Sequence, residues 1–511
     1  MLKIIKRHIF LTLTGISALV YFSGCAHFRP VEPPASEMRA VWLSRFEYCR
    51  YTSSHDQDSI RAYISDTIEK AAQSNFNVVI FQIRGSGDAY YRSGIEPWGQ
   101  LLTGKLGQDP GWDPLEYAVT EAHRQGLELH AWCNTFPAWR GPGVPPETVP
   151  RSPFLEHPEW LVCDSSGVPM PVTDHYVSFS PGIPAVHDYL VRIATDVVRR
   201  YDIDGFHFDY IRYPEQSPEL GYSHDSISVA LFNSSAGNPW KLDWEDWQRE
   251  QLTQFVCKVY DAITTIKPWV KVSAAVIGSY TGNGWTAYNS VYQDARRWTE
   301  LGKIDFIAPM IYHPRSHPTA PFMKRSLAWK NYYTVDRYVF PGIGSYRYNT
   351  DKKPYTWRET EGQVNDLRKE GFPGMVFFSA GSLDGHWESM RAKYFYNHAD
   401  IPAMDWKPAV VLLAPQNVIA DLSENLLTVS WMDTLNTTQL VAYDIYWDAD
   451  SSLSDSTLLL GTVPADSAFI WSTEWEGAPD SVNIALKARD GRRNESPFSP
   501  AERLGVAQPE Y

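Results

Sequence analysis

The sequence is short of cysteines, and the cysteines it has are not spaced as metal ligands or disulfide partners. Five occur among 511 residues, and the four that follow Cys25, at positions 49, 133, 163 and 257, include no CxxC pair. A structural zinc site is typically marked by closely spaced thiols, and a disulfide framework by a denser set of cysteines. We therefore expect these four residues to be buried free thiols.

The chain also has no excess of positive charge. Its net charge is -14 and its pI is near 5.5. Proteins that bind nucleic acid need stripes of lysine and arginine that displace counterions from the phosphates, so no nucleic-acid partner is expected. An anionic polymer is disfavoured as a partner of the whole surface, although a local basic cleft could still hold one.

Metal and phosphate motifs are missing as well. The sequence contains no HxH or HExxH pattern, and no glycine-rich turn follows its first apolar run. Neither a metal site nor a bound cofactor is expected on these grounds. The missing glycine-rich turn also disfavours an open, doubly wound nucleotide-binding sheet.

The first residues indicate export. Basic residues precede an apolar run over residues 9–22, which is too short to be the spanning helix of a polytopic membrane protein. The run ends in Phe-Ser-Gly-Cys, which resembles the lipobox of bacterial lipoproteins, where the cysteine is acylated. The resemblance implies a signal peptide over residues 1–24, lipidation at Cys25 and a tether over residues 25–37. Because alanine follows Cys25, it also implies a lipid anchor in the outer membrane of a Gram-negative cell, facing the periplasm.

The main body, over residues 38–400, alternates short apolar runs with amphipathic segments. Eight such runs separated by helical segments, for example 58–74 and 185–201, indicate parallel βαβ units. Eight units predict a closed (β/α)8 barrel, a TIM barrel of the α/β class, with an open doubly wound sheet as the alternative. The eight runs are Arg39–Ser44, Asn77–Arg84, Leu127–Cys133, Gly205–Ile211, Lys271–Gly278, Asp305–Tyr312, Tyr338–Gly344 and Gly374–Ala380.

Two long insertions interrupt the barrel pattern. They follow the third run (134–184) and the fourth run (213–243). Loops at the carboxyl ends of barrel strands build barrel active sites. We therefore expect both insertions to wall a substrate cleft.

After Trp406 the pattern changes to short alternating strands without helices. Residues 426–431, 442–447 and 482–488 are the clearest of them. This pattern predicts an all-β, immunoglobulin-like sandwich over residues 410–505. The tail resembles a fibronectin type III domain in its strand tryptophan and tyrosine and in the turn that follows its last clear strand, although it has no tyrosine at the usual corner position.

The sharpest functional pattern is Asp204–Tyr210, which reads Asp-Gly-Phe-His-Phe-Asp-Tyr. Side chains alternate along a strand, so His207 and Asp209 share one face and the two phenylalanines share the other. With the phenylalanines against the helices, Asp209 points into the barrel near the carboxyl end of its strand, where barrel chemistry takes place. The alternative is a structural ion pair of Asp209 with Arg84 or Arg212, because a charge is costly to bury without a partner or a task.

Further polar and aromatic residues end three other strands. Alternation places Gln82 and Arg84 on one face of the second run. Amides, rings and titratable groups at one rim are what an uncharged polyhydroxyl substrate needs for its orientation. The candidate substrate-binding residues are Gln82, Arg84, Asp88, Trp98, Trp132, Asn134, His207, Tyr210, Arg212, Tyr312 and His313.

Five segments in this order, Met38–Leu43, Gln82–Trp98, His130–Trp132, Asp204–Tyr210 and Asp305–Pro309, resemble the glycosyl hydrolase-like 10 family. The resemblance implies a TIM-barrel glycosidase. Some lipoprotein members of this family cut peptidoglycan glycan strands from which the stem peptides have been removed. It therefore implies denuded peptidoglycan, or a related N-acetylated polysaccharide, as the substrate.

The chain departs from the family pattern at two places. Met310 stands where members often have glutamine, which puts one substrate hydrogen bond in doubt. The fourth-strand motif often ends in Asp-Asp-Tyr, whereas here Asp209 is followed by Tyr210 and Ile211. A chitinase-type barrel would need its catalytic glutamate at Ile211, so that class is disfavoured.

Glycoside hydrolysis normally uses two carboxyl groups. Asp209 is predicted to be the nucleophile, base or cation stabiliser, and Glu96 is the first candidate for the acid, before Asp88. On an N-acetyl sugar, the substrate's own acetamide can replace the nucleophile, and Asp209 would then orient it. Arg84 or Arg212 beside Asp209 would lower its pKa and keep it ionised.

Two other functions stay open at this point. One is a tethered carbohydrate-binding barrel without catalysis. The other is a metal-dependent carbohydrate deacetylase or hydrolase that uses His207 with Asp209. The expected partners are a polysaccharide substrate and, through the lipid anchor, a membrane.

Overall fold

The computed structural model describes residues 30–505 apart from short gaps, and all structural statements below refer to these residues. The predicted signal peptide and the predicted lipidation site, Cys25, lie outside the described residues. None of the described helices is long and apolar enough to cross a membrane. The gaps are 51–54, 173–174, 216–219, 333–336, 350–354, 409–410, 424, 435, 437–439, 450–456, 466–468, 476–478, 480 and 491–493.

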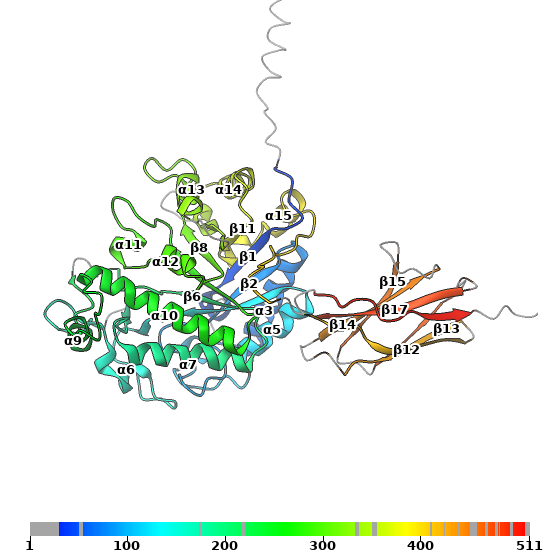
Figure 1. The fold of residues 1–511 in the computed structure, drawn as a ribbon, viewed down its shortest axis with the longest axis horizontal. Helices are drawn as coiled ribbons and strands as arrows, with labels where there is room; N and C mark the ends of the chain where they lie inside the picture. Colours follow the sequence, from blue (N-terminus) through cyan, green and yellow to red (C-terminus); the bar gives the residue numbers. More distant parts are fainter. Residues whose placement is uncertain are drawn as a thin grey trace, which may run out of the picture. The chain divides into compact units, whose positions relative to one another are not determined.

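Parallel strands at the centre of residues 38–400 close into a barrel, which confirms the predicted TIM-barrel fold (Figure 1). The first strand pairs with both the second and the last strand, and the seventh strand is split in two, β9 pairing with β8 and β10 pairing with β8 and β11. Pro341 lies between the two halves, and a proline cannot donate to a strand ladder. The strands are β1 (Met38–Leu43), β2 (Val78–Arg84), β3 (Glu128–Asn134), β6 (Gly205–Asp209), β7 (Lys271–Ile277), β8 (Phe306–Ile311), β9 (Tyr338–Val339), β10 (Gly342–Ile343) and β11 (Gly374–Phe378).

Helices surround the barrel, and several of them begin at a side chain that caps the first turn. Asp56 accepts a hydrogen bond from the Ser59 N–H at the start of α3 (Gln57–Gln73), whose buried isoleucines face the sheet. The other helices of this part are α2 (Arg45–Arg50), α4 (Gln100–Thr103), α5 (Pro114–Arg124), α6 (Pro153–Glu156), α7 (Pro184–Arg200), α9 (Ser226–Phe232), α10 (Trp244–Ile266), α11 (Ala287–Ser290), α12 (Ala295–Glu300), α13 (Phe322–Tyr332), α14 (Trp357–Lys369) and α15 (Trp387–Lys393), with 3-10 turns η1 (Pro158–Trp160), η2 (Ser345–Asn349) and η3 (Ala380–Leu383).

The last residues of the predicted tether are part of the barrel structure. Ser36 forms a parallel bridge with Asp400, and the buried Glu37 carboxylate pairs with Arg39 at 2.8 Å and with Arg368 at 2.7 Å. The chain is therefore joined to the barrel before β1 begins.

Strand β6 shows the predicted division of faces. Phe208 packs outward against Phe255 of α10, with ring centroids 6.0 Å apart. His207 points inward, where its Nε2 accepts from the Trp42 indole N–H at 3.1 Å and its Nδ1 lies 2.8 Å from the Ser273 hydroxyl. Both ring nitrogens are engaged, and burial lowers the pKa of His207 well below its ordinary value, so the ring is neutral.

Gly205 begins β6 at a close approach to the barrel interior. A Cβ at this position would lie 2.5 Å from the His130 ring. We expect Gly205→Ala to lower the free energy of unfolding by about 1–3 kcal/mol, because neither ring nor strand has room to move. Gly94→Ala is the matched control, since no atom lies within 4 Å of its added Cβ. Urea unfolding of both variants tests this, and equal midpoints would contradict it.

The C-terminal part forms two antiparallel sheets, which confirms the predicted all-β sandwich. The inner residues include Trp431, Tyr443, Ile445 and Leu486, all buried. One sheet contains, in order, β12 (Gln416–Ser423), β13 (Leu426–Met432) and β16 (Ile470–Glu474), and the other contains β15 (Leu458–Pro464), β14 (Leu440–Asp448), β17 (Ser481–Asp490) and β18 (Glu502–Gly505).

The four described cysteines are free thiols, as predicted. Cys49 and Cys133 are buried, whereas Cys163 and Cys257 are only partly buried. Burial raises the pKa of Cys133 to about 12, so this thiol is inert at neutral pH.

Candidate active site

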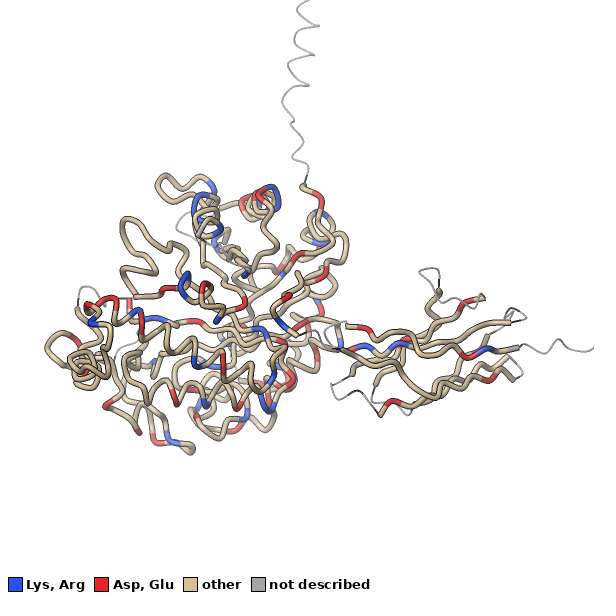
Figure 2. The backbone as a smooth tube through the Cα atoms, viewed as in Figure 1, with Lys and Arg blue, Asp and Glu red and all other residues tan. Residues whose placement is uncertain are grey.

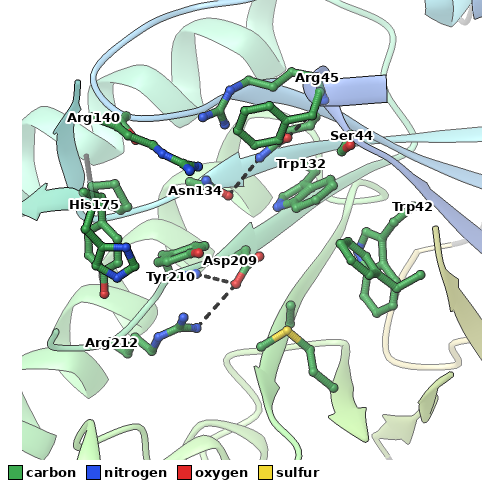
Figure 3. Close-up of a pocket in the computed structure, with 18 of the residues that line it drawn as sticks. Trp42, Ser44, Arg45, Trp132, Asn134, Arg140, His175, Asp209, Tyr210 and Arg212 are labelled. Atoms are coloured by element: carbon green, nitrogen blue, oxygen red, sulfur yellow. Dashed lines mark hydrogen bonds and ion pairs between the residues drawn. The ribbon is translucent and has the colours of Figure 1, made fainter. Parts of the chain in front are cut away.

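A cavity of about 420 Å³ opens at the carboxyl ends of the barrel strands, within the size range of small-ligand sites (Figure 3). Its lining comes from the ends of most barrel strands and from the loop after β3. This is the end of a TIM barrel at which enzymes carry their chemistry. The lining residues are Trp42, Ser44, Arg45, Phe46, Gln82, Ser86, Trp132, Asn134, Pro137, Arg140, His175, Tyr176, Asp209, Tyr210, Arg212, Ala275, Met310, Tyr312 and Phe378.

Asp209 is the one carboxylate among the described residues that line the cavity. It is the last residue of β6, and its Oδ1 accepts the Tyr210 N–H at 2.6 Å. The strand ends there, and Tyr210, which follows it, has a φ of 51°, an uncommon conformation for a bulky residue. Arg212 follows shortly after, with its Nη1 3.6 Å from Asp209 Oδ1.

Burial dominates the electrostatics of Asp209. Loss of solvent raises its pKa, while the Arg212 charge, the Tyr210 N–H and the nearby Trp132 indole lower it by less. Arg212 therefore lowers the pKa of Asp209 as expected, but burial raises it by more, so the net pKa of Asp209 is raised. Arg84, the other arginine proposed for this task, pairs with Glu96 instead.

Aromatic rings form much of the remaining wall. Phe378, at the end of β11, contacts Trp42, Trp132 and Tyr312, with ring centroids 5.9, 6.4 and 5.4 Å away. The indole N–H of Trp132 is buried beside Asp209, whose pKa it lowers, but it makes no hydrogen bond of ordinary geometry with a described residue. Rings with a polar edge of this kind suit the apolar face and the hydroxyl rim of a sugar.

The structure brings seven of the thirteen candidate site residues to the cavity. Gln82 and Asn134 are joined there by a hydrogen bond of 3.1 Å between their side chains. Residues that line the cavity are Asp209, Gln82, Trp132, Asn134, Tyr210, Arg212 and Tyr312, and residues that do not are Glu96, Arg84, Asp88, Trp98, His207 and His313.

Glu96 and Arg84 form a fully buried ion pair beside the barrel wall. Arg84 donates to both oxygens of Glu96 at 2.7 to 3.1 Å, and the Tyr189 hydroxyl donates to Glu96 Oε1 at 2.7 Å. Both side chains have no exposed surface. Glu96 therefore has no access to a substrate in the cavity.

Arg84 does not share a face with Gln82, contrary to the expectation from strand alternation. The pairing of β2 with β3 shifts register between these two residues, so that Ile83 is an extra residue of a bulge. Gln82 consequently faces the cavity, while Arg84 turns toward Glu96 and toward backbone carbonyls of the loop after β3.

Other candidate site residues that do not line the cavity make contacts elsewhere in the fold. Asp88 accepts from the Ser86 N–H and the Tyr90 hydroxyl, and Trp98 belongs to the hydrophobic core. His313 lies beside a second, smaller cavity, and burial lowers its pKa to about 4. No group of three or more His, Cys, Asp or Glu side chains in the described ranges is placed to hold a metal ion.

Sequence reasoning found Arg212 but missed three other residues of the lining, namely Arg45, Arg140 and His175. Arg45 follows β1 directly, so the rule that barrel strands present their carboxyl ends to the site could have found it. Arg140 and His175 lie in the insertion after β3, which was expected to wall the cleft and does so. The described residues of the insertion at 213–243 do not reach the cavity.

A TIM barrel with an aromatic cavity around one buried carboxylate at its carboxyl end is an arrangement that suits a carbohydrate-active protein. The chain belongs to the glycosyl hydrolase-like 10 family, whose model matches residues 37–356. Glycosyl hydrolase YngK of Bacillus subtilis (strain 168) is 27% identical over 440 residues, covering 81% of this chain and 83% of that protein. Glycosyl hydrolase DigH of Escherichia coli (strain K12) is 30% identical over 375 residues, covering 66% and 81%.

Among solved structures, α-L-fucosidase isoenzyme 2 from Paenibacillus thiaminolyticus is similar with a TM-score of 0.46 and 16% identity. The match covers 70% of this chain and 49% of the fucosidase chain, so this chain spans about half the length of that structure. A β-galactosidase from Marinomonas is similar with a TM-score of 0.44 and 13% identity, covering 66% of this chain and 53% of that chain.

Proposed function

We propose that this protein is a glycosidase in which Asp209 is the proton donor. The observation that carries the proposal is the position of Asp209, a carboxyl group with a raised pKa at the carboxyl end of a barrel strand, inside an aromatic cavity. A raised pKa keeps a carboxylic acid protonated until it meets the leaving oxygen. This role differs from the sequence-based assignment, which gave the acid to Glu96.

The substrate we propose is a glycan of N-acetylated sugars, with denuded peptidoglycan strands as the leading case. The described lining offers one carboxylate, and an N-acetyl sugar supplies the second group itself. The acetamide oxygen attacks C1, the glycosidic C–O bond breaks, and the Asp209 proton goes to the leaving oxygen. Water then attacks C1 and gives a proton to the Asp209 carboxylate, while the bond between C1 and the acetamide oxygen breaks and the acetamide is regenerated.

Product analysis tests this function directly. Purified protein is incubated with amidase-treated glycan strands, and the products are separated by chromatography and mass spectrometry. Release of oligosaccharides with new reducing ends is the expected result. Binding of the strands without any turnover would instead indicate the carbohydrate-binding barrel, and turnover abolished by a chelator would indicate the metal-dependent enzyme.

The pH dependence separates an acid from a nucleophile. If Asp209 acts protonated, kcat/KM is constant below its raised pKa and falls as the pH rises through it. The Arg212 charge lowers the pKa of Asp209, so we expect Arg212→Gln to move this fall to higher pH. Arg151→Gln is the control, because Arg151 pairs with Glu147 on the surface outside the cavity and is not among the groups that shift this pKa. Activity that rises with pH through the same region would assign the ionised form.

We also propose that the protein is a lipoprotein anchored through Cys25 in the outer membrane, facing the periplasm, with a fibronectin type III-like module at its C-terminus. The proposed lipobox supports the first part, and the division of the sandwich into sheets of three and four strands supports the second. Metabolic labelling with a fatty acid tests the anchor, since Cys25→Ala should remove both label and membrane association.

A further inference from the structure

The cavity carries more positive charge than its surroundings lead one to expect. Over the described chain, acidic and basic residues are interspersed (Figure 2), and the whole sequence has a net charge of -14. The cavity lining nevertheless includes three arginines, Arg45, Arg140 and Arg212, against the single carboxylate of Asp209. Binding of an uncharged sugar does not require this excess of positive charge in the cavity.

Arg45 is buried and forms no ion pair with a described residue. The residue is 5% exposed, and its Nε and Nη1 are buried without a hydrogen-bond partner among the described residues. Asp88 is the carboxylate whose charge acts on it, but Asp88 accepts from Ser86 and Tyr90 and forms no ion pair with the guanidinium. A buried cation with free donors is costly unless a ligand satisfies it.

Arg140 shares this side of the cavity. The guanidinium carbons of Arg45 and Arg140 lie 4.5 and 5.3 Å from the centroid of the same ring, that of Phe46. Figure 3 shows the two side chains on one side of the cavity, with Asp209 and Arg212 on the other. Two like charges against one ring repel each other, and an anion placed between them would relieve the repulsion.

Arg212 is engaged differently. Its guanidinium lies 3.6 Å from Asp209 and from Glu215, and it stacks on Tyr210 at 4.2 Å. Arg212 is therefore part of the surroundings of Asp209, the proposed proton donor. The cationic pair formed by Arg45 and Arg140 is a separate feature of the same cavity.

We propose that Arg45 and Arg140 form a subsite for a free carboxylate carried by the sugar substrate. The inference rests on the proposed glycosidase function, and it predicts that the cavity selects sugars that carry a free carboxylate. Guanidinium groups hold carboxylates through charge-assisted, often bidentate, hydrogen bonds. On a peptidoglycan strand the matching group is the lactyl carboxylate of muramic acid, which is free when no stem peptide is attached, whereas a uronic acid would present the same chemistry on C6.

Binding to the full chain tests the subsite without requiring turnover. The probes are N-acetylmuramic acid, its methyl amide, glucuronic acid and N-acetylglucosamine, measured by calorimetry at low and high salt. We expect N-acetylmuramic acid to bind roughly 10- to 100-fold more tightly than its amide, since hydrogen bonds to charged groups are worth this much, and salt should reduce the ratio. Tighter binding of glucuronic acid would place the source of the carboxylate on a uronic acid. Equal binding of acid and amide would overturn the subsite.

Variants assign the effect to the two arginines. In Arg140→Gln and in Arg45→Gln the preference for acid over amide should fall toward 1, and Arg140→Lys should keep part of it. Arg140 is exposed, so its variants remain informative if the buried Arg45 variant fails to fold. Arg151→Gln, which removes a surface cation paired with Glu147 outside the cavity, is the matched control and should keep the full preference.

Hydrolysis of amidase-treated strands and of the same strands after methylamidation of their carboxylates completes the test. Acid preference in binding with no hydrolysis of either strand would support the subsite and contradict the glycosidase. Hydrolysis of both strands at equal rates, together with equal binding of acid and amide, would support the glycosidase and contradict the subsite.

Discussion

Asp209→Asn is expected to lower kcat on denuded glycan strands by about 1,000-fold, in the middle of the range that general acid catalysis supplies. Asparagine has nearly the same size as aspartic acid and can still accept the Tyr210 N–H, so the fold should persist. Its amide cannot deliver a proton to the leaving oxygen at any pH. Single-turnover assays of reducing-end release measure the loss, and circular dichroism checks the fold.

Glu215→Gln is the matched control for this variant. Glu215 lies at the same 3.6 Å distance from Arg212 as Asp209 does, but it is exposed and does not line the cavity. Removing its charge should change kcat by less than tenfold, whereas proton donation is worth about a hundredfold or more. A similar loss in both variants would mean that the electrostatics around Arg212, and not a proton from Asp209, account for the effect.

The barrel itself could be predicted because its information is local. Each of the eight apolar runs corresponds to a parallel strand, or to a broken pair in the case of β9 and β10. Alternation and helical spacing report which residues are buried, and consecutive strands of βαβ units usually lie side by side. The break at Pro341 was the one feature of the seventh strand that alternation did not indicate.

The sequence could predict which strand face a site residue lies on, but not how far along the strand it lies from the cavity. His207 and Asp209 share a face, as alternation requires, yet His207 lies below the cavity, bound to Trp42 and Ser273, and Asp209 reaches it. A shift of two residues thus separates an interior histidine from a cavity carboxylate. The sequence period gives the face of a side chain and not its distance from the rim.

Most of the other differences between the predicted and the observed site come from strand pairing between segments that are far apart in the sequence. The bulge at Ile83 redirects Arg84 away from the cavity, and no local pattern marks it. Arg140 reaches the cavity from an insertion whose path depends on the short antiparallel pair β4 (Pro137–Arg140) and β5 (Tyr176–Ser178). Such contacts are decided by how distant segments pack, which a single sequence does not display.

The buried pair of Glu96 with Arg84 leads to the second large expected effect. Glu96→Ala should lower the free energy of unfolding by about 3–5 kcal/mol, because it leaves the Arg84 guanidinium buried without its counter-charge. The Tyr189 hydroxyl would lose its acceptor as well. Urea unfolding followed by tryptophan fluorescence measures the change. Glu147→Ala is the control, and it should leave the unfolding midpoint nearly unchanged because Glu147 and its partner Arg151 are both exposed to water.

The double variant Arg84→Met with Glu96→Leu tests the origin of that cost. If the unpaired charge is responsible, removing both charges should recover part of the stability lost in Glu96→Ala. Recovery is expected to be incomplete, because Arg84 also donates to the carbonyl groups of Asn134, Thr135 and Pro137, which remain in place.

The conservative variant Glu96→Gln should retain catalysis to within about tenfold, whereas a loss of a hundredfold or more would return Glu96 to the role of catalytic acid.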